Sequence, residues 1–532
     1  MHHIELFAGC GGLSLGLETA GFELFLANEL SPMASETFAR NLLSVDFDEK
    51  VNSEKVFWLS SEYTRSNLHA RLRENPQLAV GLKENHHSDV LGESLTLESL
   101  KRSLLVGSIS DMNSILTMPQ SPLLDILEHS KTGGIDLLSG GPPCQSFSLA
   151  GLRDPSNQRN TLPWEFAKFA ELIKPKIVLL ENVSGILRPF KIKDTKYYAW
   201  FEVAKAFAKV GYVPLCLNIN AKYVGTAQNR PRFILLGLRE DVYSAINKSD
   251  LGKTFRDALK PSKQLFDCVK SGDQPKYGSL PCFDINKDPS LFETDILSSL
   301  KTHGEGSFVS VKEAIDDLRS DRVVPSAYVE ALNGSLKNKG LHKLNKNLNH
   351  DLRANGLKVK ARFRIYQIMT KLEKEESREI SKFLKSYGQE DISFSTLTAM
   401  QEHWVLDTDG SRVEKPTNDD LKSLLKKLYT KKQTQRALRS GLPAPAALSI
   451  PDDACHYYES NDMQRTLTVR EMARIQSFPD WYQFKSKVTT GGKMRKFEVP
   501  QYTQVGNAVP PLLGIGLGKV CKKLLELASA KK

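Results

Sequence analysis

The amino-acid sequence predicts an α/β fold with a doubly wound, mostly parallel sheet and a separate lobe. Short apolar segments alternate with helical patterns through the first 240 residues, and several of these segments are apolar on both faces. Strands that are buried on both faces and separated by helices are typical of parallel sheets covered by helices. From about residue 241 the alternation gives way to helical, lysine-rich sequence, which indicates a second lobe.

The expected strands and helices fall in the first half of the chain and at its end. The strands are predicted at Ile4–Ala8, Glu23–Ala27, Ile135–Ser139, Lys176–Leu180 and Arg232–Leu236, with helices at Leu13–Ala20, Trp164–Ile173 and Leu512–Leu527. A polar, charge-rich stretch at about 41–100 does not follow this rhythm and is expected to be an insertion at the periphery of the sheet. The chain is therefore divided into a first domain at 1–240, a second region at 241–460 and a segment at 461–532 that returns to the first domain.

Composition limits the classes of protein that fit. The hydrophobic fraction of 40% and the charged fraction of 25% are typical of ordered globular chains. Seven scattered cysteines, never spaced as CxxC, argue against a disulfide framework or a zinc site, so no metal is expected. No apolar run is long enough to cross a bilayer, and the N-terminus lacks the pattern of a signal peptide. A cytosolic protein is expected.

The net charge of +11 is concentrated in two basic runs. The first run comprises Lys337, Lys339, Lys343, Lys346, Arg353, Lys358, Lys360, Arg362, Arg364 and Lys371, and the second comprises Lys422, Lys426, Lys427, Lys431, Lys432, Arg436 and Arg439. Contact with phosphate would explain both runs, and so would two solvated surfaces. Composition alone leaves both explanations open.

A glycine turn follows the first predicted strand. The segment Phe7-Ala8-Gly9-Cys10-Gly11-Gly12-Leu13 joins this strand to a helix, which lets a nucleotide-like ligand approach backbone amides. The spacing is not the dinucleotide pattern GxGxxG, because Ser14 stands at the third glycine position. Glu29 ends the next strand, where a carboxylate can accept hydrogen bonds from both hydroxyls of a ribose. Cys10 is expected only to pack.

A second cysteine follows the strand predicted at Ile135–Ser139. In Gly140-Gly141-Pro142-Pro143-Cys144, two prolines fix the backbone before Cys144. The carboxyl ends of strands are where open parallel sheets place their chemistry. A buried structural cysteine is the alternative, but glycine and proline turns seldom lie in a core. We therefore interpret Cys144 as a nucleophile.

An acid and two arginines lie at the ends of neighbouring strands. Glu181, in Glu181-Asn182-Val183, follows one predicted strand, and Arg230 and Arg232 precede another. A cysteine protease would need a histidine base beside its cysteine. A cytosine ring instead becomes electrophilic at carbon 6 when its nitrogen 3 is protonated or strongly hydrogen-bonded, which a carboxyl group can provide. One of the arginines could hold the carbonyl oxygen of the base and orient Glu181.

These blocks resemble, in residues and in order, the signature motifs of the DNA (cytosine-5)-methyltransferase family. The matching segments are Phe7–Gly12 (FxGxGG), Pro143–Gln145 (PCQ), Glu181–Val183 (ENV) and Gln228–Arg232 (QxRxR), followed by Arg465–Glu471 and Gln504–Pro510. The resemblance covers about the first 240 residues, apart from the insertion, and the last 70. It implies a fold of the S-adenosylmethionine-dependent methyltransferase type.

The resemblance also implies the cofactor and the residues that hold it. The methyl donor would be S-adenosylmethionine, and the target base would be flipped out of the duplex. Phe7 would stack on the adenine, Glu29 would hold the ribose, and Asn507, Val509 and Leu162 would line the pocket. Further cofactor contacts are expected at Gly9, Gly11, Gly12, Leu13 and Pro142, and the catalytic residues are expected to be Cys144, Glu181, Arg230 and Arg232.

The end of the family's third strand departs from the usual pattern. The family often has Gly-Asp-Ile there, with the aspartate bound to the adenine amino group, whereas this chain has Gly107-Ser108-Ile109 followed by Ser110-Asp111. Ser108 could make a weaker contact, Asp111 could substitute, or a backbone carbonyl could suffice. We expect Ser108 and Ile109 to line the adenine pocket.

By this resemblance the chain methylates carbon 5 of a cytosine in a specific double-stranded DNA sequence through a covalent adduct between Cys144 and carbon 6. Residues 241–460 would be the target-recognition region. The expected setting is a bacterial restriction–modification system in the cytoplasm, with a monomeric enzyme and an endonuclease that acts separately. Methylation of cytosine in tRNA and a catalytically inactive DNA-binding relative are the alternatives. The length of 241–460 argues against the first, and the intact Cys144, Glu181 and Arg232 argue against the second.

Overall fold

The computed structural model describes residues 1–49, 54–91, 95–143, 161–192, 195–319, 321–322, 324–336, 344–386, 389–432, 434–446, 453–460 and 463–530. Its centre is a nine-stranded sheet with the strand order β12-β9-β11-β6-β5-β1-β2-β4-β3. The strands are β1 (His2–Leu6), β2 (Glu23–Glu29), β3 (Val56–Trp58), β4 (Ser103–Val106), β5 (Leu137–Gly140), β6 (Ile177–Val183), β9 (Tyr212–Asn220), β11 (Pro231–Arg239) and β12 (Cys282–Asp284). β1 to β6 run parallel, and β11 is antiparallel to both of its neighbours.

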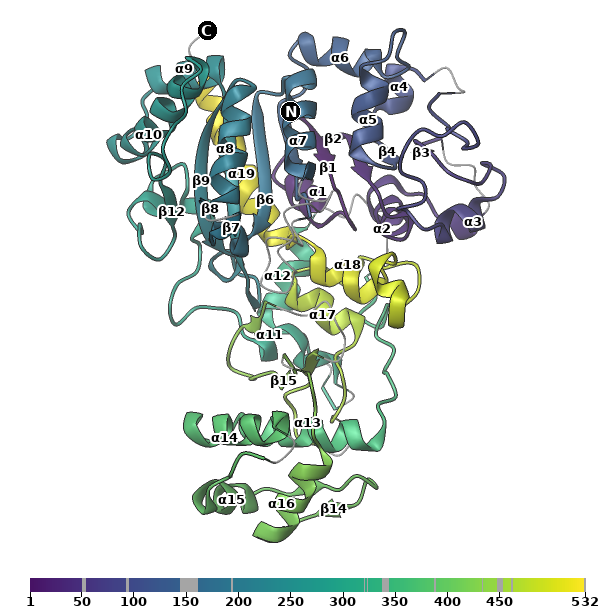
Figure 1. The fold of residues 1–532 in the computed structure, drawn as a ribbon, viewed down its shortest axis with the longest axis vertical. Helices are drawn as coiled ribbons and strands as arrows, with labels where there is room; N and C mark the ends of the chain where they lie inside the picture. The colour runs from purple at the N-terminus through teal and green to yellow at the C-terminus, as the bar shows by residue number, and fades with distance from the viewer. Residues whose placement is uncertain are drawn as a thin grey trace.

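Helices cover the sheet in two layers (Figure 1). One layer contains α5 (Ile109–Leu116), α6 (Leu124–Lys131), α7 (Leu162–Ile173), α8 (Ala199–Lys209) and α10 (Lys253–Lys270), and the other contains α1 (Gly12–Thr19), α9 (Glu240–Lys248) and α19 (Pro511–Ser529). The sheet between these layers is apolar on both faces, because β4 and β5 are buried along their whole length and β6 along nearly all of it. The predicted doubly wound α/β fold is confirmed.

The predicted strands are present, with shifted ends. β1 was expected at Ile4–Ala8 but ends at Leu6, because Phe7 adopts a positive φ of 54° and breaks the extended backbone. β6 and β11 are longer than expected, since they pair with each other over seven consecutive residues. The closing helix, expected at Leu512–Leu527, is α19 and begins with a proline at its first position, where a missing N–H costs no hydrogen bond.

The described residues within 41–100 form short elements at the edge of the sheet. β3 pairs only with β4 and is the edge strand, and α3 (Leu68–Arg73) and α4 (Leu97–Leu100) lie beside it. Arg71 is fully buried here, where it forms an ion pair with Asp89 (2.8 Å) and lies over the ring of Trp58 at 5.3 Å. These contacts give the segment its own polar core.

The predicted boundary at residue 241 differs from the structure. After β11 the chain forms α9 and α10, which pack against the sheet, and then β12, which extends the sheet beside β9. The cause is the apolar face of α10: Phe255, Leu259 and Phe266 are buried against α8 and β9. The chain therefore stays with the sheet to about residue 300.

A separate apolar core lies at the far end of the molecule, in what we call the lobe, residues 357–437 (Figure 1). It is built from α13 (Leu357–Met369), α14 (Lys374–Lys385), α15 (Phe394–Gln401), α16 (Asn418–Lys427), β13 (Val405–Leu406), β14 (Arg412–Val413) and β15 (Arg436–Ala437). The elements between the lobe and the sheet are α2 (Pro32–Phe38), α11 (Val311–Ile315), α12 (Ala327–Ser335), α17 (Val469–Ile475), α18 (Gln501–Asn507), β10 (Gln228–Asn229), β16 (Ala444–Pro445) and β17 (Ala454–Cys455), and the hairpin of β7 (Phe190–Ile192) and β8 (Thr195–Tyr197) follows β6.

The last helix returns to the first. α19 packs along α1, where Gly16 and Gly514 allow the two backbones to come close together. Among the described residues, no helix combines the length and the apolar character that crossing a membrane requires.

Candidate active site

The first strand ends in a tight glycine turn that leads into α1. Phe7, Gly9 and Gly11 all have positive φ, at 54°, 55° and 88°. At Gly12, where the helix begins, an added Cβ would lie 2.3 Å from the carbonyl oxygen of Val509. Only glycine fits there, because a side chain would push the C-terminal block away. The turn thus brings Gly12 and Val509 together, as a shared pocket requires.

Glu29 ends β2 beside this turn. One carboxylate oxygen accepts a hydrogen bond from the N–H of Gly9 and the other from the N–H of Ser31, both at 2.8 Å. Burial raises the pKa of Glu29 above its usual range, against the effect of these amides. The two bonds fix the orientation of the carboxyl group next to the glycine turn.

Three other predicted cofactor residues pack around the same strand ends. Phe7, Leu162 and Val509 are half-buried against the main apolar core, and the Phe7 ring meets Phe166 edge-on with centroids 6.3 Å apart. Asn507 is exposed at the end of α18. The side chain of Leu13 is buried in the core, so this residue offers only its backbone to a ligand.

The departure from the family pattern lies at the end of β4. Ser108 caps α5, where its hydroxyl accepts a hydrogen bond from the N–H of Asp111 (3.1 Å), and Ile109 is buried beside it. Both carboxylate oxygens of Asp111 accept from the N–H of Gly81, at 3.2 and 3.1 Å. Asp111 is therefore held by the peripheral segment, which disfavours it as the substitute for the family's aspartate.

The predicted catalytic residues belong to the edge of the sheet formed by the ends of β5 and β6. β5 ends at Gly140, and the carbonyl oxygen of Pro142 accepts a hydrogen bond from the side chain of Asn182 (3.1 Å). Cys144 and the rest of 144–160 lie outside the described residues. Glu181, on β6, reaches the chain just before them: a Cβ on Gly141 would lie 3.0 Å from its Oε2. Glu181 therefore approaches the chain at Gly141, which stands three residues before Cys144 in the sequence.

Glu181 forms an ion pair with Arg232 on the adjacent strand. The Nε of Arg232 lies 2.5 Å from the Oε1 of Glu181, and both side chains are about nine-tenths buried. The antiparallel register of β6 and β11 creates this pair, because Val183 is opposite Arg232 and Glu181 is opposite Ile234. The ion pair leaves Oε2 of Glu181 directed toward Gly141.

Arg230 is used differently, although the sequence grouped it with Arg232. Its guanidinium donates to the carbonyl oxygens of Gly506 (2.9 Å) and Ala508 (3.0 Å), and it is 3% exposed. Burial lowers the pKa of Arg230, and the neighbouring charge of Arg232 lowers it further. The side chain fixes the C-terminal block beside β11 rather than contacting Glu181.

The sequence identified Arg465–Glu471 as a family block, but it did not show that Arg465 and Glu471 form a buried polar cluster with His456. Arg465 donates to both carboxylate oxygens of Glu471 (2.8 and 2.7 Å), and the Nε2 of His456 lies 3.8 Å from the same carboxylate. Burial acts to raise the pKa of Glu471, but the charge and hydrogen bonds of Arg465 outweigh it and hold the pKa at about 2. The signal in the sequence is the capping box Thr468-x-x-Glu471 at the start of α17.

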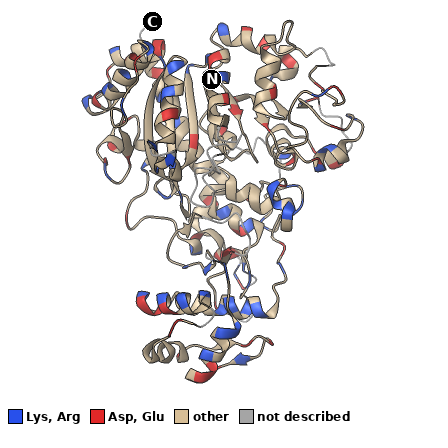
Figure 2. Cartoon of the chain, viewed as in Figure 1, with Lys and Arg blue, Asp and Glu red and all other residues tan. Residues whose placement is uncertain are grey.

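The two basic runs differ in burial, and Figure 2 shows where lysine and arginine lie along the fold. Arg362 and Arg364 are buried in the lobe, and Arg364 stacks on Trp404 at 3.9 Å and pairs with Glu459 at 3.1 Å. Phosphate contact is therefore wrong for these two arginines, because their charge is used inside the protein. The second run is exposed at all seven positions. Outside the described residues lie Lys337, Lys339 and Lys343.

The described residues contain no group of His, Cys, Asp or Glu that could hold a metal ion. Cys10 is 2% exposed, and burial raises the pKa of its thiol, as suits a residue that only packs. The polar groups gather instead at the carboxyl ends of neighbouring parallel strands, as in α/β enzymes that bind nucleoside cofactors. The fold and this arrangement define a methyltransferase of the S-adenosylmethionine-dependent class.

Comparison with known proteins gives the family. The model of the C-5 cytosine-specific DNA methylase family matches residues 1–57 and 120–523. The Type II methyltransferase M.DdeI of Desulfomicrobium norvegicum is 26% identical over 523 residues, covering 98% of this chain and 88% of that protein. M.Bpa9945I of Bacillus paralicheniformis is 25% identical over 545 residues, covering 98% and 99%.

The chain belongs to the C-5 cytosine-specific DNA methylase family. It is an enzyme that transfers a methyl group from S-adenosylmethionine to carbon 5 of cytosine in DNA. The internal stretch that the family model leaves unmatched, 58–119, contains Ser108, where the sequence departs from the family pattern. The glycine turn, closed by Val509, and the fixed carboxyl group of Glu29 fit a nucleoside with free ribose hydroxyls.

Proposed function

We propose that Cys144 is the nucleophile and that Glu181 activates the target base. The observation that carries this proposal is the buried Arg232–Glu181 ion pair, which leaves Oε2 of Glu181 facing Gly141, three residues before Cys144 in the sequence. Cytosine nitrogen 3 would meet this oxygen and share a proton with it, which makes carbon 6 electrophilic. Arg232 orients the carboxyl group, and its guanidinium is suited to hold the carbonyl oxygen of the base.

The proposed reaction has three steps. The Cys144 thiolate adds to carbon 6, which breaks the aromatic system and makes carbon 5 a nucleophile. S-adenosylmethionine, when bound, supplies the electrophilic methyl group that carbon 5 takes. Loss of the carbon 5 proton to a proton acceptor then restores the ring double bond and expels the Cys144 thiolate. The target cytosine enters the site by flipping out of the duplex.

We further propose that the cofactor lies over the glycine turn. Glu29 would accept hydrogen bonds from the ribose, Phe7 would stack on the adenine, and Ser108 and Ile109 would line the adenine pocket. This is supported by the fixed carboxyl group of Glu29 and by the position of Ser108 at the end of the adjacent parallel strand. The further proposed contacts are Gly9, Gly11, Gly12, Leu13, Pro142, Leu162, Asn507 and Val509.

The lobe is proposed to be the target-recognition region, and the enzyme to act as a monomer on one double-stranded DNA sequence. The full-length relatives named above are bacterial Type II methyltransferases. On that basis we propose a bacterial, DNA-associated modification enzyme of a restriction–modification system, whose endonuclease acts separately. Arg230, assigned to catalysis from the sequence, is proposed to support the C-terminal block instead.

The test uses duplex DNA that carries 5-fluorocytosine at the target position. Fluorine at carbon 5 cannot leave as a proton, so the unmutated enzyme is expected to accumulate a covalent complex that survives denaturing electrophoresis. Cys144→Ala should form none, whereas Cys268→Ala, on α10, should form it normally. Glu181→Gln should form it at least 100-fold more slowly, since general acid–base catalysis contributes about 10²–10⁴-fold. An adduct in Cys144→Ala would show that another residue is the nucleophile.

Bisulfite sequencing of DNA from a host free of methylation would give the recognised sequence. Protection of cytosine in one short context, present with the unmutated enzyme and absent with Cys144→Ala, is the expected result. Protection without sequence preference would contradict the proposed role of the lobe.

A further inference from the structure

Two adjoining hollows lie on the lobe and at its base. The first is bounded by α13, α14 and β15, and the second by residues of 312–322, 370–371 and 457–459. Thr370 lines both hollows, and Arg439 of the first is flanked in the chain by Leu438 and Ser440 of the second. The hollows are therefore parts of one depression, which we call the lobe groove.

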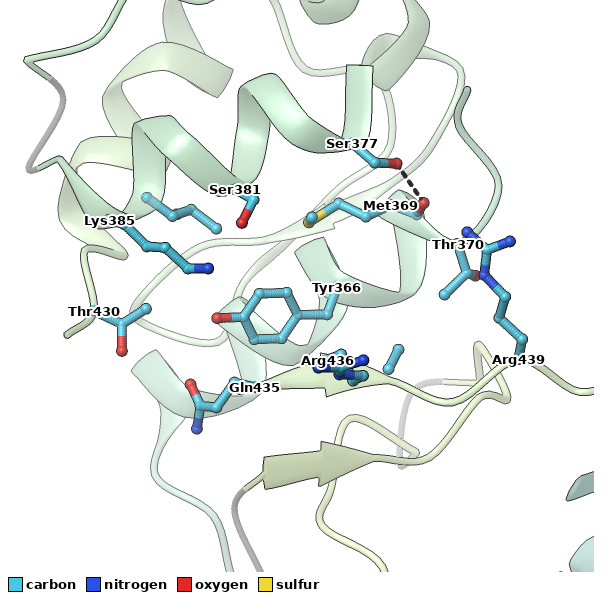
Figure 3. A pocket seen from close by; sticks show the side chains of 12 residues that line it. Tyr366, Met369, Thr370, Ser377, Ser381, Lys385, Thr430, Gln435, Arg436 and Arg439 are labelled. Carbon is cyan, nitrogen blue, oxygen red and sulfur yellow. Dashed lines mark hydrogen bonds between the residues drawn. The ribbon is translucent and has the colours of Figure 1, made fainter. Parts of the chain in front are cut away.

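The first hollow is basic and rich in hydroxyl groups (Figure 3). Its charged lining residues are Lys385, Arg436 and Arg439, and none of its described lining residues is Asp or Glu. Figure 3 shows the Lys385 amine directed into the same space as the Tyr366 ring, with Gln435 and Arg436 on the opposite side. Cations and hydroxyl donors without a carboxylate among them are suited to the oxygens of a phosphate.

Capping of the nearby helix ends does not explain why three cations gather here. Basic side chains near the end of a helix often bind its last carbonyl groups. In this hollow the carbonyl oxygen of Met369 already accepts from the hydroxyl of Ser377 (2.7 Å), and that of Leu384 accepts from the N–H of Thr430 (3.1 Å). All three cations are exposed, and the Nε of Arg436 donates to the carbonyl oxygen of Thr434 (3.2 Å).

The second hollow continues the positive charge toward the sheet. Its three carboxylates are in ion pairs: Asp316 and Asp321 with Arg319, and Glu459 with Arg364 and Lys371. Lys312 is exposed in this hollow, and its N–H donates to the carbonyl oxygen of Ser440 (2.9 Å). This bond places the backbone of Lys312 beside Ser440, the residue after Arg439, so a basic residue of the second hollow lies close in the fold to one of the first.

We propose that the lobe groove binds the sugar–phosphate backbone of duplex DNA beside the recognised sequence. Arg436, Arg439 and Lys385 would contact phosphate oxygens in the first hollow, and Lys312 would extend the contact in the second. This rests on the proposed role of the lobe in target recognition and adds the surface and the groups that hold the duplex. Contacts to phosphate fix the position of a protein on DNA without reading its sequence.

The test compares two double variants of the same lobe. Arg436→Ala/Arg439→Ala removes two charges from the groove, and Lys422→Ala/Lys426→Ala removes two exposed charges from α16, outside it. The dissociation constant is measured between 50 and 200 mM salt, for one duplex that contains the recognised sequence and one that does not. In the groove variant the slope of log Kd against log salt should fall by about two, one for each phosphate contact. Each contact corresponds to about a three- to fourfold change in Kd over that range.

Three outcomes separate the explanations. Equal slopes in the groove variant and the α16 variant would overturn the proposal. If the groove variant loses affinity only for the duplex with the recognised sequence, and its slope is unchanged, the groove reads bases instead. That result would also overturn the proposal. Equal weakening on both duplexes with a reduced slope would support it.

Two controls keep the result interpretable. Affinity for S-adenosylmethionine should be unchanged in the groove variant, and Arg436→Lys/Arg439→Lys, which keeps both charges, should keep the slope of the unmutated enzyme. If the slope falls in the lysine variant as much as in the alanine variant, the charge of these residues does not cause the salt dependence and the proposal fails. The 5-fluorocytosine adduct of the unmutated enzyme tests the chemistry separately, so an adduct together with unaltered slopes would refute only the groove.

Discussion

Two arginines that stand two residues apart show how one motif serves two purposes. Arg232 pairs with Glu181 at the end of β6, whereas Arg230 donates to backbone carbonyls of the C-terminal block. The sequence predicted that both guanidinium groups belong near the site, but it could not separate them. The partner carbonyl of Gly506 is 276 residues away along the chain, and only the folded topology brings it close.

Arg230→Ala is expected to destabilise the fold by about 2–4 kcal/mol, because two buried carbonyl oxygens lose their donors. The same change should weaken cofactor binding, since the 506–509 segment closes the glycine turn. Urea unfolding and calorimetric titration with S-adenosylmethionine measure the two effects. Arg239→Ala, at the far end of β11 and half-exposed, is the control and should cost less than about 1 kcal/mol. Equal losses in the two variants would contradict the role given to Arg230.

Glu5 gives a prediction about pH. It is 2% exposed and accepts a hydrogen bond from the hydroxyl of Ser14, and burial raises its pKa to about 8. The folded state holds the proton of the Glu5 carboxyl group more tightly than the unfolded chain does. The contribution of Glu5 to stability is therefore complete below about pH 4.5. It is then lost as the pH rises to about 8, at about 1.4 kcal/mol per pH unit within that window.

Glu5→Gln, which cannot ionise, should therefore raise the melting temperature at pH 8.5 and have little effect at pH 5. Thermal unfolding at the two pH values measures this. A variant that is equally stabilised or destabilised at both values would show that Glu5 does not titrate in this window.

At the level of elements, the sequence predicted the strand pattern and the site segments better than the contacts between distant elements. The five predicted strands are present, and the glycine turn and the acid lie at strand ends, because apolar runs and turn residues are local signals. The end of β1 was missed, since a positive φ at a phenylalanine has no sequence signal. The packing of α1 against α19 was also not predicted, because it joins segments about 500 residues apart.

The crossing of α1 and α19 depends on glycine. A Cβ on Gly16 would lie 2.4 Å from the carbonyl oxygen of Pro511 and 2.6 Å from the Cα of Gly514. Gly16→Ala is therefore expected to cost about 1–3 kcal/mol in urea unfolding, because the backbones must separate. Gly334→Ala, in α12 with nothing within 4 Å, is the matched control and should be neutral or stabilising by up to about 1 kcal/mol. Similar behaviour of the two variants would contradict the close crossing.

At the level of the whole molecule, the buried apolar residues that the structure describes form three cores. One surrounds the sheet, one joins the glycine turn to α17 and α18, and one fills the lobe. The change in composition near residue 241 predicted a second lobe but not where it begins, because α10 is lysine-rich like the later region and yet has a buried apolar face that packs beside the sheet. Burial, which decides the boundary, is not visible in charge patterning.

The separate core of the lobe predicts that it opens independently of the sheet. S-adenosylmethionine at about 100 times its Kd stabilises the part of the protein that binds it, here proposed to be the part around the sheet, by about 2.7 kcal/mol. Hydrogen exchange of β1, β2 and β5 should slow on adding the cofactor, and that of α13–α16 should not change. Equal protection of both sets would show a single cooperative unit and contradict this prediction.

The contact of Gly12 with Val509 has a consequence for the timing of activity during synthesis. At about 5–20 residues per second, a ribosome needs roughly 25–100 s to make the chain between these two positions. The residues of the glycine turn are synthesised early, but Val509, which packs against Gly12, is added only near the end of synthesis. If the cofactor lies over this turn as proposed, the order of the segments predicts that an unfinished chain binds S-adenosylmethionine only weakly until after the lobe has been made.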